Sequence, residues 1–410
     1  MYFAVLREPP PEARVALVPD IIRQMRGQGH EVGIEAGAGQ GAQYPDALYE
    51  EAGAEIFEDR AALLSRAHVL LTLRPTPADE WPSVRSGTVL IGLLAPLIRP
   101  SFMEQLARLG VQTFSLDALP RISRAQSMDV LSAMSTVSGY RAAIVAAERV
   151  GRFLPMLMTA AGTIAPARVL VLGAGVAGLQ AVATTHRLGA VVQAFDARPA
   201  VKEQVESLGA TFLTLPDVTA EGTGGYARAV GADEEAREQE FLAGPVRNAD
   251  IVITTAMVPG QRAPLLVTEA MVASMHPGAV IMDLAAEAGG NTAATIPGSV
   301  CERHGVIIDG STDLPAQMAQ PASQLYSRAV WNFVRHLLEH GLSVESGGER
   351  PILPAGDDAI IHDTLITHDD RVVHEATLAR LAEMAADVAV PAGDVLDAKG
   401  GPTDDHGSFA

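Results

Sequence analysis

The sequence predicts an α/β protein made of two Rossmann-like, doubly wound parallel-sheet domains joined by two long helices. Three observations predict this fold. Short apolar strands alternate with helical segments in two successive series, as in parallel sheets with crossover helices. A glycine-rich turn, GAGVAG at 173–178, joins a strand to a helix within the second series. With 410 residues and 48% hydrophobic content, the chain has room for two or three domains with large cores.

The first series occupies about the first 130 residues, the size of one doubly wound domain. Its predicted strands are Tyr2–Leu6, Glu31–Glu35, Glu55–Phe57, His68–Leu73, Thr88–Leu94 and Gln112–Ser115. Its predicted helices are Pro19–Gln28, Asp46–Ala52, Arg60–Arg66 and Phe102–Leu109.

Two long helices are predicted to connect the domains. The first begins after Asp129, where apolar residues recur at helical spacing and Gly139 offers a point of close packing. The second, Ala322–His340, should pack on the first and return the chain to the first domain. The expected domains are therefore residues 1–136 plus 314–380, and residues 137–313.

The second series surrounds the glycine-rich turn, whose helix reaches about Leu188. Its predicted strands are Val169–Leu172, Val191–Phe195, Thr211–Leu215, Asp250–Thr254, Val280–Leu284 and Val306–Asp309, with a further helix at Pro199–Leu208. The glycine-rich, acidic stretch after Leu215 is expected to begin as a mobile surface loop. Further on we expect a loop at Leu314–Pro321, a hairpin at Asp358–Val373, a helix near Thr377–Ala386 and a flexible tail placed at 381–410.

The glycine turn has the arrangement of a dinucleotide-binding βαβ unit. Gly173 allows the tight turn, Gly175 lets the backbone approach a pyrophosphate, and Gly178 lets helix and strand pack closely. Free backbone N–H groups at the start of the helix attract phosphate. Asp196, at the end of the next strand, suits ribose hydroxyls and repels a 2′-phosphate, so the pattern favours NAD over NADP. The alternative is a glycine turn in an ordinary βαβ unit.

The composition argues against several classes of protein. A formal charge of −19 disfavours a nucleic-acid partner or an anionic-membrane surface. Cys301 is the only cysteine, so no internal disulfide can form and a reducing compartment is expected. The apolar run Val89–Ile98 is too short to span a bilayer, so we expect a cytoplasmic chain without direct membrane insertion. Histidines such as His68, His186 and His276 lack metal-ligand spacing, and no metal site is predicted.

Six motifs carry a resemblance to a known family. They are PRISRAQSMD (120–129), GAGVAGLQAVAT (173–184), AFDARPAVKEQVESLGA (194–210), GGYA (224–227), ITTAMVPGQRAP (253–264) and MDLAAEAGGN (282–291). From its N-terminus to about His374, the chain resembles the NAD(H)-binding domain, or free alpha subunit, of proton-translocating, Si-specific/Re-specific NAD(P)+ transhydrogenase. Alanine dehydrogenase is the relative with the same fold.

The resemblance implies cofactors and partners. It implies NAD(H) bound between the two Rossmann-like domains, a homodimer, and direct hydride exchange with NADP(H) held on a partner subunit. It also implies a membrane proton-channel subunit as partner. The chain would then be peripheral to the inner or plasma membrane through these partners.

The resemblance further implies a catalytic loop. Arg121, Gln126 and Asp129 match the family's Arg–Gln–Asp loop, with Ser132 beside it, which holds the nicotinamide and its ribose. The amide of Gln126 can donate and accept hydrogen bonds, the carboxylate of Asp129 can accept them, and Arg121 can contact phosphate. The alternative is a solvated, charged helix start with Asp129 as its N-cap.

The remaining matches lie around the rest of the nucleotide. The residues of the pyrophosphate and adenosine side are Gly173, Gly175, Val176, Ala177, Gly178, Asp196, Ala197 and Arg198. Gly225 and Tyr226 match a mobile loop whose tyrosine closes over the nucleotide in the family. Gln239 matches a nucleotide contact near a one-residue insertion, and Met257 is expected near the nicotinamide ribose.

Departures from the family's patterns separate the candidate functions. Alanine dehydrogenase needs an arginine and a lysine for the substrate carboxylate, and a histidine as acid and base. Arg14 is present, as it is in transhydrogenases, but the lysine position is Arg74 and the histidine position is Ala95. Oxidising an amine requires proton transfer, whereas hydride transfer between two nicotinamides requires only close, oriented rings. The predicted function is the transhydrogenase subunit, with an amino-acid (alanine) dehydrogenase and a regulatory NAD-binding module as alternatives.

Overall fold

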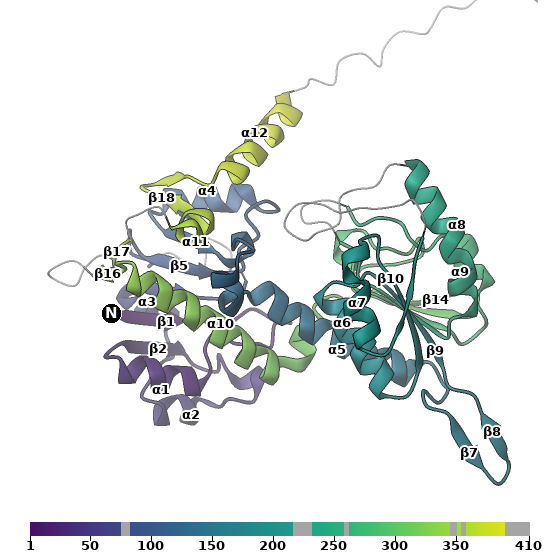
Figure 1. Cartoon of the computed structure of the whole chain (residues 1–410). Helices are drawn as coiled ribbons and strands as arrows, with labels where there is room; N and C mark the ends of the chain where they lie inside the picture. The colour runs from purple at the N-terminus through teal and green to yellow at the C-terminus, as the bar shows by residue number, and fades with distance from the viewer. Residues whose placement is uncertain (75–82, 216–231, 258–261, 345–350, 354–357, 390–410) are drawn as a thin grey trace, which may run out of the picture.

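The computed structural model describes residues 1–74, 83–215, 232–257, 262–344, 351–353 and 358–389. Two large sheets, each flanked by helices, form two lobes that long helices join (Figure 1). The predicted α/β fold with two Rossmann-like, mainly parallel sheets is confirmed.

The first sheet has eight strands in the order β19-β18-β6-β5-β4-β1-β2-β3. Their bounds are β1 Tyr2–Val5, β2 Glu31–Glu35, β3 Glu55–Phe57, β4 Val69–Leu71, β5 Val89–Gly92, β6 Gln112–Ser115, β18 Leu365–His368 and β19 Arg371–Val372. Its helices include α1 Pro19–Gly27, α2 Asp46–Glu51, α3 Arg60–Arg66 and α4 Pro100–Arg108. The first six strands are parallel, whereas β18 is antiparallel to both of its neighbours. Because the strand order reverses between β1 and β4, the ends of these two strands form a topological switch point.

The second sheet has seven strands in the order β11-β10-β9-β12-β13-β15-β14. Their bounds are β9 Arg168–Leu172, β10 Val191–Phe195, β11 Thr211–Leu213, β12 Ile251–Thr254, β13 Val280–Asp283, β14 Val300–Arg303 and β15 Val306–Asp309. Its helices include α6 Val176–Arg187, α7 Lys202–Ser207, α8 Ala232–Asn248 and α9 Glu269–Ser274. All pairs are parallel except β14 with β15. Here the order reverses between β9 and β12, which are direct neighbours.

Two long helices connect the lobes, as predicted. Helix α5 (Val130–Arg149) leaves the first lobe and packs along α6, and α10 (Ala319–Glu339) packs on α5 and returns (Figure 1). Gly139 makes the close approach possible, because a Cβ on it would overlap the carbonyl oxygen of Ala177 in α6. By length and composition alone α5 could cross a membrane. Its contacts with α6 and α10 explain the apolar composition instead.

Several elements differ from the predictions. An exposed hairpin, β7 (Leu157–Thr159) with β8 (Gly162–Ile164), and the edge strand β14 were not predicted, because neither has the alternation of a half-buried strand. The predicted hairpin at Asp358–Val373 is wrong over its first residues, which form helix α11 (Ala359–Thr364); only β18 and β19 form the hairpin.

Helix α12 (Glu375–Ala389) is longer than predicted, and 390–410 lie outside the described residues. The expected surface loop after Leu215 also lies largely outside them, at 216–231. The division into residues 1–136 plus 314–380 and residues 137–313 stays our proposal.

Candidate functional site

The glycine turn lies at the switch point of the second sheet, between β9 and α6. Gly173 has φ +97°, and a Cβ on it would lie 2.6 Å from Oγ1 of Thr255 at the end of β12. A Cβ on Gly178 would overlap the Gly173 carbonyl oxygen. In contrast, a Cβ on Gly175 would meet no atom within 4 Å. The turn is therefore packed against its own backbone on one side and open at Gly175, where an approaching phosphate would lie.

Asp196 is tied to this turn. Its Oδ2 accepts a hydrogen bond of 2.7 Å from the backbone N–H of Ala174, and its side chain is 6% exposed. Arg198 holds both carboxylate oxygens, through Nε to Oδ1 and Nη2 to Oδ2 at 2.8 Å each. The hydrogen bond to Asp196 raises the pKa of the Arg198 guanidinium, although burial opposes the shift. The carboxylate therefore has a fixed position beside the turn, as a ribose-binding group needs.

The segment after β12 is held by residues that the sequence analysis did not single out. Asn291 is fully buried and donates to the carbonyls of Ala256 and Pro264, at 2.9 and 2.8 Å, while its Oδ1 accepts from Ala256 N–H. Asp283, at the end of β13, accepts from the backbone N–H of Asn291 at 2.8 Å. Both residues lie in the MDLAAEAGGN motif, so their local pattern was visible. They fix the backbone that leads to Met257, whose side chain is 49% exposed.

Helix α8 presents a different residue to the site than expected. The amide of Gln239 donates to the carbonyl of Leu265 at 2.7 Å, which ties it to the protein. The preceding residue, Glu238, is 3% exposed, and its Oε1 has no hydrogen-bond partner in the described part of the chain. Burial and the negative charges of Glu234, Glu235 and Asp196 raise the pKa of Glu238 to about 7. Glu238 therefore lies within the electrostatic field of Asp196.

The segment 121–129 lies on the first lobe, just before α5. Its 3-10 helix η4 (Ser123–Met128) buries Ala125 and Met128 in the first core and leaves Gln126 exposed. Arg121 is also exposed to solvent. The carbonyl of Ser127 accepts a 2.8 Å hydrogen bond from Asn332 of α10, which anchors the segment from behind. The segment thus has a fixed buried face and a polar outer face.

Asp129 is the N-cap of α5, as the alternative interpretation expected. Its Oδ1 accepts from the backbone N–H of Ser132 at 2.8 Å, and its Oδ2 accepts from the Ser132 hydroxyl at 2.5 Å. The structure therefore brings Asp129 and Ser132 together in a structural role. This role does not exclude a nucleotide contact, because each carboxylate oxygen has two lone pairs.

One helix links the two halves of the site. Asp129 caps α5, and ten residues later Gly139 lies against Ala177, in the first turn of α6. At 1.5 Å per residue the two points are about 15 Å apart along the helix axis. Gly225 and Tyr226, predicted to cover the nucleotide, lie outside the described residues.

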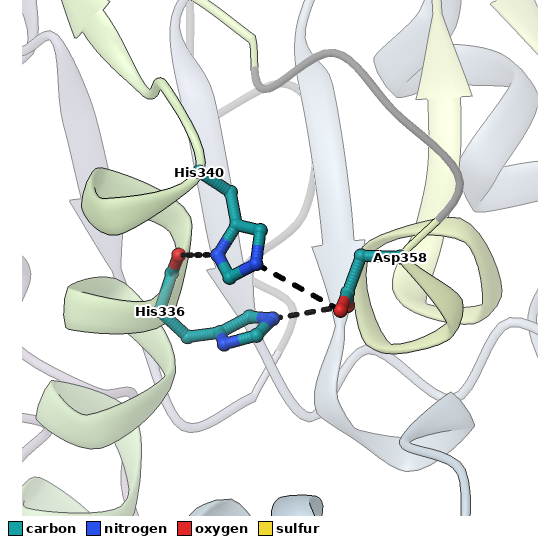
Figure 2. Close-up of side chains that lie close together, drawn as sticks. All are labelled: His336, His340 and Asp358. Carbon is teal, nitrogen blue, oxygen red and sulfur yellow. Dashed lines mark hydrogen bonds and ion pairs between the residues drawn. The ribbon is translucent and has the colours of Figure 1, made fainter.

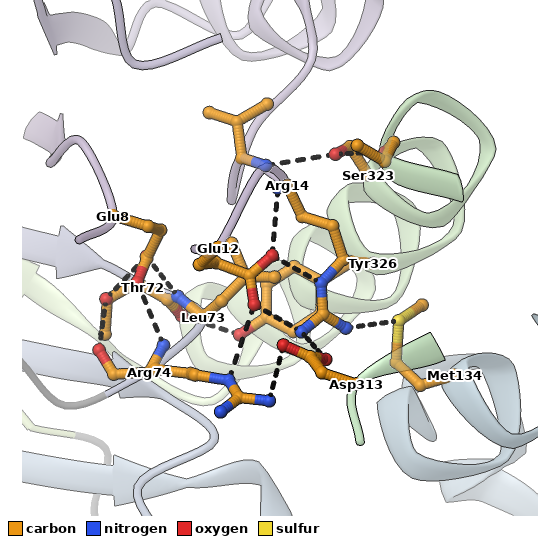
Figure 3. A network of polar contacts seen from close by, with 12 residues as sticks. Glu8, Glu12, Arg14, Thr72, Leu73, Arg74, Met134, Asp313, Ser323 and Tyr326 are labelled. Carbon is orange, nitrogen blue, oxygen red and sulfur yellow. Dashed lines mark hydrogen bonds and ion pairs between the residues drawn. The ribbon is translucent and has the colours of Figure 1, made fainter. Parts of the chain in front are cut away.

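The switch point of the first sheet is filled by a polar network (Figure 3). Glu8 follows β1 and is 5% exposed; its Oε1 accepts from Leu73 N–H at 2.6 Å and from the Thr72 hydroxyl at 2.8 Å. Burial raises the pKa of Glu8 to about 7, although these hydrogen bonds oppose the shift. Glu8 therefore occupies the place where α/β folds commonly bind ligands.

Arg14 lies in the same network and is fully engaged. Its Nη2 contacts Oε2 of Glu12 at 2.5 Å and Oδ1 of Asp313 at 2.9 Å, and its side chain is 4% exposed (Figure 3). Arg74 contacts the other oxygen of Asp313 at 2.9 Å. Burial alone would raise the pKa of Glu12, but hydrogen bonds and charge from Arg14 hold it below its ordinary value. Two carboxylates thus already occupy the guanidinium that a substrate carboxylate would need.

Comparison with known proteins shows similarity over nearly the whole chain. Residues 4–138 match the family "Alanine dehydrogenase/PNT, N-terminal domain", and residues 142–375 match "Alanine dehydrogenase/PNT, C-terminal domain". The chain is 43% identical to a Rhodospirillum rubrum protein named as the first of the separate parts of NAD(P) transhydrogenase subunit alpha, over 375 residues, 90% of this chain and 96% of that protein. It is 28% identical to alanine dehydrogenase of Mycobacterium tuberculosis over 387 residues, 93% of this chain and 94% of that protein.

A solved structure agrees with these similarities. The transhydrogenase from Sinorhizobium meliloti superposes with a TM-score of 0.80 and 40% identity, covering 91% of this chain and all of that one.

Proposed function

This chain belongs to the alanine dehydrogenase/PNT family, on the side of the NAD(P) transhydrogenase alpha subunits, and we propose that it is the NAD(H)-binding subunit of a proton-translocating transhydrogenase. In this role it would pass a hydride between NADH and NADP+, the latter held on a partner subunit. The observation that carries the choice within the family is the occupied guanidinium of Arg14.

The residues of the second lobe fit NAD(H). The open side of Gly175 and the free N–H groups at the start of α6 suit a pyrophosphate. Asp196 is held where it can accept hydrogen bonds from ribose hydroxyls, and its charge disfavours a 2′-phosphate. Bound NAD(H) supplies the hydride or accepts it. The exposed Gln126 and Arg121 would orient the nicotinamide end, with Asp129 and Ser132 at the start of α5.

The same residues explain why no acid or base is needed. Hydride transfer between two nicotinamides depends on the distance and alignment of the rings, which positioning groups such as Gln126 can set. Alanine oxidation would require a group that accepts a proton from the amine. At the position where alanine dehydrogenase has its histidine this chain has Ala95, whose backbone N–H donates to Asp117 at 2.9 Å.

Partner subunits follow from the proposed role. Because the described helices pack within the two lobes, proton translocation requires a membrane proton-channel subunit, and NADP(H) requires its own binding subunit. We place the chain in the cytoplasm, peripheral to the inner or plasma membrane through these partners. The homodimer is also a proposal: the hairpin β7–β8 projects from the second lobe and exposes Met158 (76%) and Ile164 (44%), which a second copy could cover (Figure 1).

An assay with and without a partner tests the proposal. The purified chain should bind NADH by calorimetry but transfer no hydride to an NADP+ analogue until an NADP(H)-binding transhydrogenase domain is added. Efficient oxidation of L-alanine by the purified chain would contradict the proposal and favour alanine dehydrogenase. Binding of NADH without transfer, even with the partner domain present, would favour a regulatory module.

A further inference from the structure

A cluster of two histidines and one aspartate lies at the end of α10, outside the proposed nucleotide site (Figure 2). His336 and His340 are one helical turn apart, and their ring centroids lie 4.1 Å apart. Asp358 comes from the N-cap of α11 and faces both rings. The potential ligand atoms of the three residues all lie within 4.8 Å of one another. His336 and Asp358 have side-chain exposures of 9% and 10%, whereas His340 is 37% exposed and gives access from solvent.

The protonation pattern of His340 leaves a lone pair directed at the carboxylate. Nδ1 of His340 lies 2.7 Å from the carbonyl oxygen of His336, and a carbonyl only accepts hydrogen bonds, so Nδ1 carries a proton. In the neutral ring Nε2 is then an acceptor. It lies 3.9 Å from Oδ2 of Asp358, too far for a hydrogen bond. Two electron-rich atoms therefore face each other across a gap that a cation would stabilise.

We propose that His336, His340 and Asp358 form a binding site for a divalent transition-metal ion of the zinc class. Two imidazoles and one carboxylate form a ligand set that zinc uses, with the fourth position left to water. Tetrahedral zinc with ligands at about 2.1 Å holds neighbouring ligand atoms about 3.3 Å apart. The distances from His336 and His340 to Asp358, 3.0 and 3.9 Å, lie on either side of this value. The hydrogen bond from Nδ1 of His340 to a carbonyl is the outer contact that orients a ligating imidazole.

Arg124 competes with the metal ion for the same carboxylate. Its Nη1 lies 3.0 Å from Oδ2 of Asp358, the oxygen that faces His340. Burial would raise the pKa of Asp358, but hydrogen bonds from His336 and Arg124 outweigh it and hold that pKa well below its ordinary value. The carboxylate is therefore ionised and ready to ligate. A metal ion on Oδ2 would repel the guanidinium and displace it.

Displacing Arg124 would act on the proposed nicotinamide segment. Arg124 lies in η4, two residues before Gln126, and its ion pair with Asp358 joins η4 to α11. Asn332 anchors the same segment to α10 independently, through the carbonyl of Ser127. Metal binding would remove one of these two anchors and leave the other. The site thus connects a metal ion to the position of 121–129 without touching the nucleotide.

Titration of the metal-free full chain with Zn2+ by calorimetry tests the site. We expect one equivalent to bind, and bound Co2+ to show the visible absorption of a tetrahedral complex. His340→Gln should weaken the affinity at least about tenfold, since loss of even an outer contact to a metal ligand typically costs about 10–100-fold. Asp358→Asn should weaken it as well, while asparagine still caps α11. His304→Gln is the matched control, because His304 forms a 2.8 Å pair with Glu269 and has no second histidine beside it.

Arg124→Gln tests the competition. Removing the guanidinium should strengthen Zn2+ binding several-fold, and Zn2+ should speed hydrogen exchange of the backbone amides of 123–128 in the unmodified chain. Zn2+ binding that His340→Gln leaves unchanged, or the absence of saturable binding, would overturn the site. An affinity that Arg124→Gln does not alter would overturn the link to η4. None of these readouts depends on hydride transfer, so they stand apart from the proposed function.

Discussion

Gly139 of α5 lies directly against the backbone of Ala177 in α6, so closely that a Cβ on residue 139 would overlap the Ala177 carbonyl oxygen. Gly139→Ala must therefore push the two helices apart, and overpacking of this kind typically costs about 1–3 kcal/mol of unfolding free energy. Because Ala177 belongs to the GAGVAG segment, NADH affinity should fall as well. Chemical unfolding and calorimetry measure the two effects.

Gly244→Ala in α8 is the control for that variant, since a Cβ there meets no atom within 4 Å. It should be neutral or stabilise the protein by up to about 1 kcal/mol through helix propensity. Equal effects of the two substitutions would show that the contact between α5 and α6 is not tight in solution.

Asp196 should make NADH bind more tightly than NADPH. A 2′-phosphate beside this nearly buried carboxylate should cost about 2 kcal/mol or more, a factor of roughly thirty in affinity. Asp196→Asn should narrow the difference while keeping an acceptor for Ala174 N–H. Calorimetric titration of both nucleotides measures this. Equal affinities in the unmodified chain would remove the case for Asp196 as the selective residue.

Gln126 should act on transfer more than on binding. Shortening the side chain by Gln126→Asn should leave NADH affinity within a few fold but reduce single-turnover transfer to the partner's NADP+ analogue by on the order of a hundredfold, because misplaced rings lose their reactive geometry. Gln24→Asn, on the exposed face of α1, is the matched control. A variant that lost NADH binding but kept its transfer rate would reverse this assignment.

Tyr226 should act on closure. Tyr226→Phe is expected to raise the NADH dissociation constant and to slow transfer only modestly, as for a loop that covers bound nucleotide. The same two assays measure it. A large loss of transfer at unchanged affinity would instead place Tyr226 beside the reacting rings.

Glu8 should make stability depend on pH. Its pKa is raised from 4.5 to about 7 in the folded chain, so between these values the folded state binds more protons than the unfolded state. Its contribution to stability is therefore lost as pH rises from about 5 to 7. Glu8→Gln should gain stability relative to the unmodified chain over this range, by up to about 3 kcal/mol at pH 8.

Unfolding of both proteins in urea at pH 5, 6, 7 and 8 measures this difference. Glu51→Gln, which removes the same charge from the exposed end of α2, controls for the change in net charge. A stability difference for Glu8→Gln that stays constant with pH would show that Glu8 does not titrate in this range.

Much of the fold was predictable, because buried parallel strands leave strong local signals. Glu31–Glu35, Gln112–Ser115 and Val191–Phe195 match the observed strands residue for residue. The elements that were not predicted have the opposite property. The hairpin β7–β8 is mostly exposed, so it has no apolar alternation, and α11 was missed although Asp358 is a recognisable N-cap.

The site was predictable where its pattern is local and hidden where it depends on distant contacts. The glycine turn and Asp196 lie within one βαβ unit. The partners of Arg14 could not be predicted, because Asp313 is 299 positions away in sequence. The exchange of Gln239 for Glu238 depends on the rotation of α8, which one insertion is enough to alter. The resemblance to a family located segment 121–129, but only coordinates show that Asp129 and Ser132 pair with each other.

The position of β18 has a consequence for biosynthesis. The first sheet is completed only when Leu365–His368 pairs with β6, about 250 residues after β6 has left the ribosome. All strands of the second sheet lie between Arg168 and Asp309, so that sheet is complete first. The edge of β6 must therefore wait, unpaired, while a later stretch of the chain folds. A chaperone or the second lobe itself has to shield that edge during translation, and truncation before residue 365 should make the nascent chain prone to aggregate.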